Sequence, residues 1–141
     1  MTSFIMKILL LLSLLSAVLS NQTPQEQFKY LDTNGNGILK EDDILEFIKK
    51  NDKNGDESLD FDEFIGTRPP SEPPLRSKGA FNLYDKMDVK KDGKMSSSLA
   101  PAFIKLLDKD KNGEVTFQEF EERIKKIVDG IDREAKKLEK K

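Results

Sequence analysis

The segment Asp108-Lys-Asp-Lys-Asn-Gly-Glu-Val-Thr-Phe-Gln-Glu119 carries the strongest structural signal in the chain. Asp108, Asp110 and Asn112 place side-chain oxygens at every second position, and Gly113 allows a sharp turn with positive φ. Glu119 ends the segment with two further oxygens. Donor sets made only of oxygen suit hard divalent cations. The segment therefore predicts a cation-binding loop that leads into a helix.

This spacing resembles the twelve-residue calcium loop of the EF-hand family, D-x-[DN]-x-[DN]-G followed by Glu at position twelve. The resemblance implies that the ligands of this loop, called loop four (108–119), are Asp108, Asp110, Asn112, the Glu114 carbonyl, Thr116 and Glu119. Thr116 and Glu119 also form a capping-box pattern, which predicts that a helix begins here. Thr23 and Glu26 form the same pattern around Pro24, which predicts a first helix that runs to about Leu31.

Loop two (52–63) follows the same pattern with one departure, because Glu57 replaces the glycine of position six. A non-glycine residue in the left-handed region costs about 1–2 kcal/mol, so we expect weaker calcium binding than in loop four. Asp60 at position nine adds negative charge in partial compensation. The ligands implied here are Asp52, Asn54, Asp56, Ser58, Asp60 and Glu63.

Loop one (32–43) keeps its glycine, Gly37, but ends in Asp43 rather than glutamate. The shorter carboxylate reaches a central ion less easily, which weakens Ca²⁺ and relatively favours the smaller Mg²⁺. The ligands implied here are Asp32, Asn34, Asn36, the Ile38 carbonyl and Asp43. Loop three (88–99) has Lys90 at position three and Leu99 at position twelve, so we expect a loop of similar shape without a metal.

The four loops form an internal repeat. They start at residues 32, 52, 88 and 108, so a shift of 56 residues superposes loops one and two on loops three and four. Core positions keep the same register, as when Phe47 aligns with Phe103 and Phe64 with Phe120. The predicted fold is all-α, with EF-hand helix–loop–helix units in two copies of a 56-residue two-loop repeat, joined by short β bridges between loops.

The interval of 20 residues within each copy restricts how the loops can pair. A single helix of about 11 residues, roughly 16 Å long, must follow loop one and precede loop two. Loops at opposite ends of one helix cannot lie side by side. We therefore predict that loop two pairs with loop three and that loop four returns to loop one.

The chain begins with a predicted secretory signal. Ile8–Leu19 is apolar except for two serines, follows Lys7, and is too short to span a membrane. We expect cleavage before Asn21, secretion, and no stable membrane span afterwards. The predicted organisation is a signal peptide (1–20), a first unit (21–66), a Pro-rich extended connector (67–77), a second unit (78–132) and a basic tail (133–141).

Composition excludes several function classes. Cys and His are both absent, which rules out disulfides, thiol nucleophiles, zinc fingers and imidazole bases. A net charge of −2 argues against nucleic acid as a partner. An amphipathic helix is expected after loop four, packed on its own domain as far as Ile131, and a surface for an unknown protein partner is its alternative role.

These observations predict a secreted calcium-binding protein without catalytic activity, acting as a calcium-stabilised structural or protein-interaction module. A calcium sensor or buffer of the secretory pathway is the alternative, although a methionine-rich groove is not available, since only Met87 and Met95 follow the signal. A carboxylate-based hydrolase is the enzyme alternative, because such chemistry needs neither His nor Cys. The acidic residues nevertheless concentrate at ligand positions.

Overall fold

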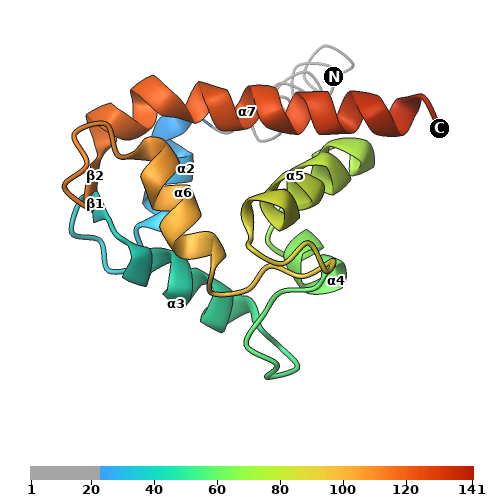
Figure 1. Ribbon diagram of the computed structural model, residues 1–141, viewed down its shortest axis with the longest axis horizontal. Helices are drawn as coiled ribbons and strands as arrows, with labels where there is room; N and C mark the ends of the chain where they lie inside the picture. Colours follow the sequence, from blue (N-terminus) through green and yellow to red (C-terminus); the bar gives the residue numbers. More distant parts are fainter. Residues whose placement is uncertain (1–22) are drawn as a thin grey trace, which may run out of the picture.

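The computed structural model describes residues 23–141, so the predicted signal peptide, its cleavage site and Asn21 lie outside the described residues. Within 23–141 the chain forms helices α2 to α7 and one two-stranded sheet. Figure 1 shows α7 running along the molecule, with α2 and α6 below one half and α5 below the other. None of the helices in the described part is both long and apolar enough to cross a bilayer.

Two helices begin at capping boxes that the sequence predicts. Thr23 caps α2 (Pro24–Leu31) by accepting the Glu26 N–H, while the Glu26 carboxylate accepts the Thr23 N–H at 2.9 Å. Thr116 and Glu119 make the same reciprocal pair at the start of α7 (Phe117–Glu139). Each box satisfies backbone donors that the first helical turn leaves free.

Several of the helices beside the loops are short. The predicted 11-residue helix between loops one and two is confirmed as α3 (Glu41–Asn51). Loop two leads into α4 (Phe61–Ile65), which has only five residues. Loop three leads into α6 (Leu99–Leu107), whose C-terminus opens loop four.

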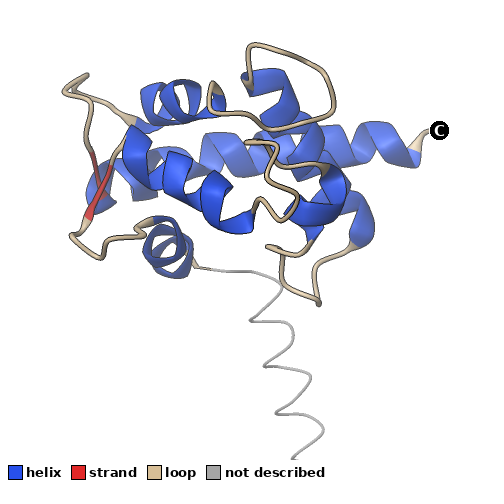
Figure 2. Cartoon of the chain, turned by 90° about the horizontal axis from the view of Figure 1, so that it is seen from below, coloured by secondary structure: helices blue, strands red, loops and turns tan. Residues whose placement is uncertain are grey.

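The predicted loop pairing is confirmed. In loop one, β1 (Ile38–Leu39) runs antiparallel to β2 (Val115–Thr116) of loop four, with Leu39 opposite Val115. Loops two and three meet at a bridge in which Leu59 and Met95 exchange two backbone hydrogen bonds of 2.8 Å. Figure 2 shows the β1–β2 ladder at the end of the molecule remote from the C-terminus. Each pair therefore joins one of the first two loops to one of the last two.

One hydrophobic core joins both loop pairs. The four bridge residues, Leu39, Val115, Leu59 and Met95, are at most 1% exposed and belong to the same cluster of buried side chains. Aromatic rings link the helices around them, as when Phe28 of α2 meets Phe120 of α7 edge to face at 5.3 Å. Burial of this apolar surface is the main favourable term for folding.

Helix α5 (Pro74–Met87) packs closely along the C-terminal half of α7. A Cβ placed on Gly79 would lie 2.8 Å from backbone atoms of Ile131 and Ala135. The two helices can approach this closely only because Gly79 has no side chain. The basic tail predicted over 133–141 is not separate from the preceding helix. Residues 133–139 continue α7, and Glu134 is buried there with an ion pair of 2.5 Å to Lys86.

The Pro-rich connector is not extended as predicted. Thr67 and Arg68 donate to carbonyls at the end of α4, a further turn joins Glu72 to Pro69, and α5 already begins at Pro74. Glu72 is buried and accepts hydrogen bonds from the Arg68 guanidinium at 2.5 and 2.7 Å. The prolines exclude a continuous helix, but this ion pair closes a turn, and Glu72 also accepts the Ser77 hydroxyl of α5 at 2.6 Å.

Candidate metal centres

Loop four brings three carboxylates together. Oxygen atoms of Asp108, Asp110 and Glu119 all lie within 4.8 Å of one another. Asp108 is buried at the C-terminal end of α6, and its Oδ2 accepts the Gly113 N–H at 2.7 Å. The turn at Gly113, with φ of 82°, closes the loop around this carboxylate. The arrangement gathers negative charge at one point, as a cation site requires.

The glutamate at position twelve, Glu119, connects the end of loop four to its beginning. Glu119 Oε1 accepts the N–H groups of Lys109 and Asp110 at 3.1 and 3.3 Å, and Oε2 accepts the Thr116 N–H at 3.0 Å. The start of α7 is thereby tied to the start of the loop. Thr116 Oγ1 is engaged as the helix cap, accepting the Glu119 N–H.

Hydrogen bonds and mutual repulsion set the ionisation of this group. The Thr116 N–H, with those of Asp110 and Lys109, holds the pKa of Glu119 below its ordinary value against the effect of burial. Burial raises the pKa of Asp110, and its neighbours Asp108 and Glu119 raise it further because their charges repel. A cation bound among these carboxylates would relieve the repulsion between them.

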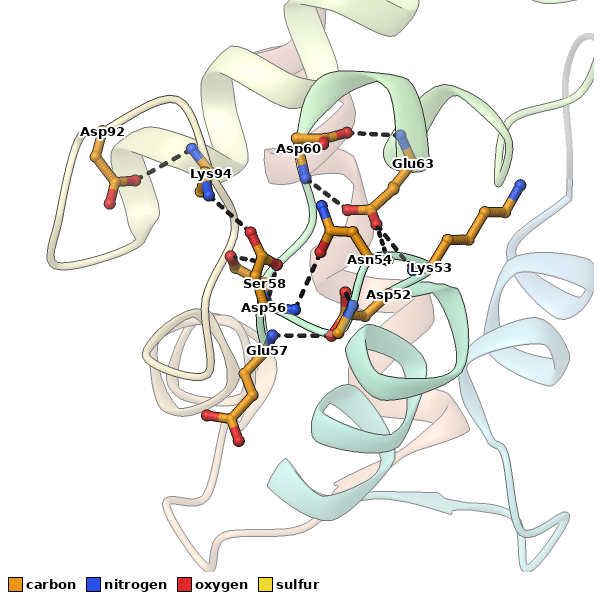
Figure 3. Close-up of polar contacts among 11 residues, drawn as sticks. Asp52, Lys53, Asn54, Asp56, Glu57, Ser58, Asp60, Glu63, Asp92 and Lys94 are labelled. Carbon is orange, nitrogen blue, oxygen red and sulfur yellow. Dashed lines mark hydrogen bonds and ion pairs between the residues drawn. The ribbon is translucent and has the colours of Figure 1, made fainter.

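Loop two repeats this geometry (Figure 3). Carboxylate oxygens of Asp52, Asp56 and Glu63 lie within 4.8 Å of one another. Glu63 Oε1 accepts the N–H groups of Lys53 and Asn54 at 2.8 and 3.1 Å, as Glu119 does in loop four. The group therefore offers a second site of the same kind.

Two further predicted ligands of loop two are turned to other partners. Asp60 does not join the carboxylate group, since its Oδ1 caps α4 by accepting the Glu63 N–H at 2.9 Å. Ser58 Oγ donates to Asp56 Oδ1 at 3.1 Å and so supports a ligand candidate rather than facing the centre itself. Figure 3 shows both contacts.

Loop one has a similar backbone turn, but its last acidic side chain makes fewer contacts across the loop than in loops two and four. Asp32 Oδ2 accepts the Gly37 N–H at 2.8 Å, and Asp32 Oδ1 is buried without a hydrogen-bond partner. Asp43 accepts the Thr33 hydroxyl and the Lys40 N–H, both at 3.0 Å, but does not reach the backbone amides that Glu63 and Glu119 contact. The missing methylene explains this shorter reach.

The asparagine ligands of all three loops sit in tight turns. Each side-chain oxygen accepts the N–H two residues further on, at 2.9–3.0 Å; these residues are Asn34, Asn36, Asn54 and Asn112. Such Asx turns hold the oxygens within the curve of the loop. The predicted carbonyl ligands, Ile38 and Glu114, lie in or next to the β1–β2 ladder.

Loop three keeps its turn but uses different partners. The Gly93 N–H is accepted by Asp85 of α5 at 3.1 and 3.2 Å, whereas position-six amides elsewhere bind the first loop residue. That first residue, Asp88, accepts the Ser96 N–H at 2.6 Å and the hydroxyls of Ser96 and Ser98. No sequence pattern pointed to Asp85, because its role depends on where α5 ends.

The backbone adopts the left-handed conformation at position six of loop two, as the resemblance to calcium loops predicts. Glu57 has φ of 65° at position six of loop two, the conformation for which the missing glycine predicts strain. Lys111 at position four of loop four has φ of 61°, a second strained position that the sequence reasoning missed. Gly35 and Gly55 take up the same position in loops one and two, and comparison of these loops could have revealed it.

The donor sets fit a calcium ion. Loops two and four each supply three converging carboxylates and further oxygens, with no nitrogen or sulfur side-chain donor. Loop one supplies two carboxylates and a buried oxygen that lacks a partner, which a cation would satisfy. The residues that would hold the ion are therefore the loop ligands, and the ion would neutralise carboxylates that otherwise repel.

The fold and these sites are those of a helical protein with paired candidate cation-binding loops. A family model described as an EF-hand domain pair matches residues 3–51. This match, which includes loop one, supports an EF-hand calcium-binding family, and such a domain suggests calcium binding. Searches of curated proteins and of solved structures found no match.

Proposed function

We propose that this chain is a secreted, non-catalytic calcium-binding protein in which bound calcium stabilises a structural or protein-interaction module. The observation that carries the proposal is the convergence of three carboxylates in each of loops two and four. Without a cation these carboxylates repel one another. With one, each loop holds its flanking helices together, so calcium binding and folding become coupled.

Calcium stabilisation should reach the whole fold rather than one loop. The bridge residues of both loop pairs lie in a single core, so tightening one pair tightens the packing on which the other depends. The millimolar calcium outside cells suits sites with the defects seen in loops one and two. This coupling supports a structural role.

Calorimetric titration of calcium into the metal-free protein, with helicity followed in parallel, tests the proposal. We expect two or three bound ions and a rise in thermal stability. Absence of binding at millimolar calcium would overturn it. Magnesium as a competitor tests the separate proposal that loop one accepts Mg²⁺, in which case the weakest site should be displaced first.

The sensor alternative has one observation in its favour. A cavity of about 310 Å³ lies among the helices, with apolar walls that include Phe47, Tyr84 and Ile127 and polar groups that include Arg68 and Glu72. A sensor opens such a space when calcium binds. Fluorescence of a dye that binds apolar surface should increase with calcium for a sensor, and should fall or stay constant for a structural module.

The hydrolase alternative would need a carboxylic acid with a raised pKa outside the loops. Glu72 and Glu134 are buried and lie outside the loops. Burial raises the pKa of Glu72, but hydrogen bonds from Arg68 and Ser77 outweigh it and the pKa is lowered. Lys86 lowers the pKa of Glu134. These groups support a structural role for both acids.

Secretion and signal cleavage need a test of their own. The protein should be recovered from the medium of expressing cells, and its N-terminal sequence should begin at Asn21. Recovery only from the cell interior, with an intact Met1, would overturn this part of the proposal. A protein partner that binds the C-terminal helix also remains a proposal, and it would have to contact faces of α7 that α5 leaves free.

A further inference from the structure

A lysine from loop three contacts a candidate calcium ligand of loop two. Lys94 Nζ lies 2.7 Å from Asp56 Oδ2, an ion pair between residues 38 positions apart (Figure 3). The Leu59–Met95 bridge brings the two loops together, and Lys94 directly precedes Met95. Both side chains are partly exposed, so solvent and a cation can reach them.

Asp56 belongs to the carboxylate group of loop two. Its oxygens lie within 4.8 Å of those of Asp52 and Glu63, and its other oxygen, Oδ1, accepts the Ser58 N–H and hydroxyl at 3.1 Å. An ammonium group on this carboxylate therefore stands next to the place where a calcium ion would bind.

The other loop pair contains a similar ion pair that avoids the ligands. Lys40 of loop one lies 3.0 Å from Glu114 of loop four, with similar exposure. The Glu114 carboxylate is outside the converging group of Asp108, Asp110 and Glu119, since this residue is expected to use its backbone carbonyl. The chain thus offers a matched comparison within one molecule.

We propose that Lys94 is a tethered cation that lowers the calcium affinity of loop two. The inference rests on the proposed calcium binding of that loop. The ammonium group shares a carboxylate with the ion and repels it, while in the metal-free loop it offsets repulsion among the acidic ligands. Loop three, which lacks a ligand set, would then act on its partner through one side chain.

Removing the charge should tighten binding at loop two. Because the pair is partly exposed and screened, we expect Lys94→Gln to lower the calcium dissociation constant of loop two by about threefold to tenfold. High salt should shrink the difference, since it screens the repulsion. Affinity at loop four should not change.

Nuclear magnetic resonance can follow each loop separately in the uniformly ¹⁵N-labelled protein. The Glu57 and Gly113 amides donate to the first carboxylates of loops two and four, at 2.8 and 2.7 Å, so each signal reports its own loop. Calcium titration of wild type and Lys94→Gln gives the two midpoints. Lys91→Gln controls for net charge in loop three, and Lys40→Gln controls for loss of a similar cross-loop pair.

A double-mutant cycle with Asp56→Asn tests the contact itself. We expect the effect of Lys94→Gln to be much smaller in the Asp56→Asn background. An unchanged or higher midpoint for Glu57 in Lys94→Gln would overturn the proposal, as would an equal shift in Lys91→Gln. If Gly113 responds to calcium and Glu57 responds in no variant, this inference fails while calcium binding stands. If neither signal responds, the proposed function fails as well.

Discussion

The loop one–loop four pair and the loop two–loop three pair share a backbone frame but use their side chains differently. In the first pair both loops carry ligand sets, and a two-residue ladder joins them. In the second pair only loop two has converging carboxylates, and loop three satisfies its own Asp88 with serine hydroxyls. The paired-loop frame therefore does not require converging carboxylates in both loops, because bridge residues in the core maintain it.

The largest expected effect tests whether loop three is needed as structure. Met95 is 1% exposed at the bridge, and Met95→Ala should lower the free energy of unfolding by about 3 kcal/mol, because it leaves a cavity in the shared core. Urea denaturation with calcium and with chelator should show the loss in both conditions. Val89→Ala, at a side chain that is 85% exposed in the same loop, should change stability by less than about 0.5 kcal/mol. A loss seen only with calcium would instead indicate an ion in loop three.

The second prediction concerns ligation in loop four. Glu119→Gln should weaken calcium binding at this loop about a hundredfold, because it removes a charge that also holds three backbone amides in place. The Gly113 amide signal measures the midpoint, and Glu121→Gln, on the exposed side of α7, is the matched control. An unchanged midpoint would show that position twelve contributes no ligand.

The third prediction concerns the pH dependence of stability that Asp88 gives to loop three. Burial raises the pKa of Asp88, but hydrogen bonds from Ser98 and Ser96 outweigh it, so the folded pKa is below the ordinary value. The stability that this carboxylate contributes is therefore complete at neutral pH and is lost as pH falls through the folded pKa. Asp88→Asn should cost about 1–2 kcal/mol at neutral pH.

At acidic pH the loss of stability caused by Asp88→Asn should be smaller, because Asp88 of the wild-type protein is then protonated and uncharged, like asparagine. Denaturation in chelator at neutral pH and at about pH 2 measures the difference. Asp62→Asn, at an exposed side chain of α4, is the control and should show little change at either pH. An equal cost for Asp88→Asn at both pH values would contradict the role of its charge.

The smallest predicted effect concerns the left-handed positions. Lys111→Gly should stabilise the protein by about 0.5–1 kcal/mol, because glycine removes the strain of a positive φ at that position. Lys91 holds the same position in loop three without a positive φ, so Lys91→Gly should give no gain. Thermal unfolding of both variants makes the comparison. A gain from Lys91→Gly alone would reverse the assignment of strain to loop four.

Local pattern was sufficient for much of the fold. The capping pair of Thr23 and Glu26 predicted where α2 begins, and the interval between loops one and two predicted α3 and the loop pairing. These features depend on residues that are close in the sequence, or on the number of residues between two motifs. Both can be read directly from the sequence. The convergence of Asp108, Asp110 and Glu119 was predicted for the same reason.

Several side-chain contacts that depend on helix packing were not predicted. Burial of Glu134 against Lys86, the folding of the connector around Glu72, and the use of Asp85 by Gly93 all depend on how helices pack. Asp60 was expected among the ligands, but its place at the start of α4 makes it a helix cap. A charged residue in sequence has several potential partners, and packing selects among them.

The positions of the loops, the oxygen donors they offer, the glycine-dependent turns and the spacing that prevents loops one and two from pairing could all be predicted from sequence. These properties follow from residue chemistry and from the reach of a short helix. Which charges meet across the loop pairs depends instead on the folded structure, as with Lys94 and Asp56 and with Lys40 and Glu114. Coulomb interaction falls with distance in space, and distances between loops are fixed only once the shared core has formed.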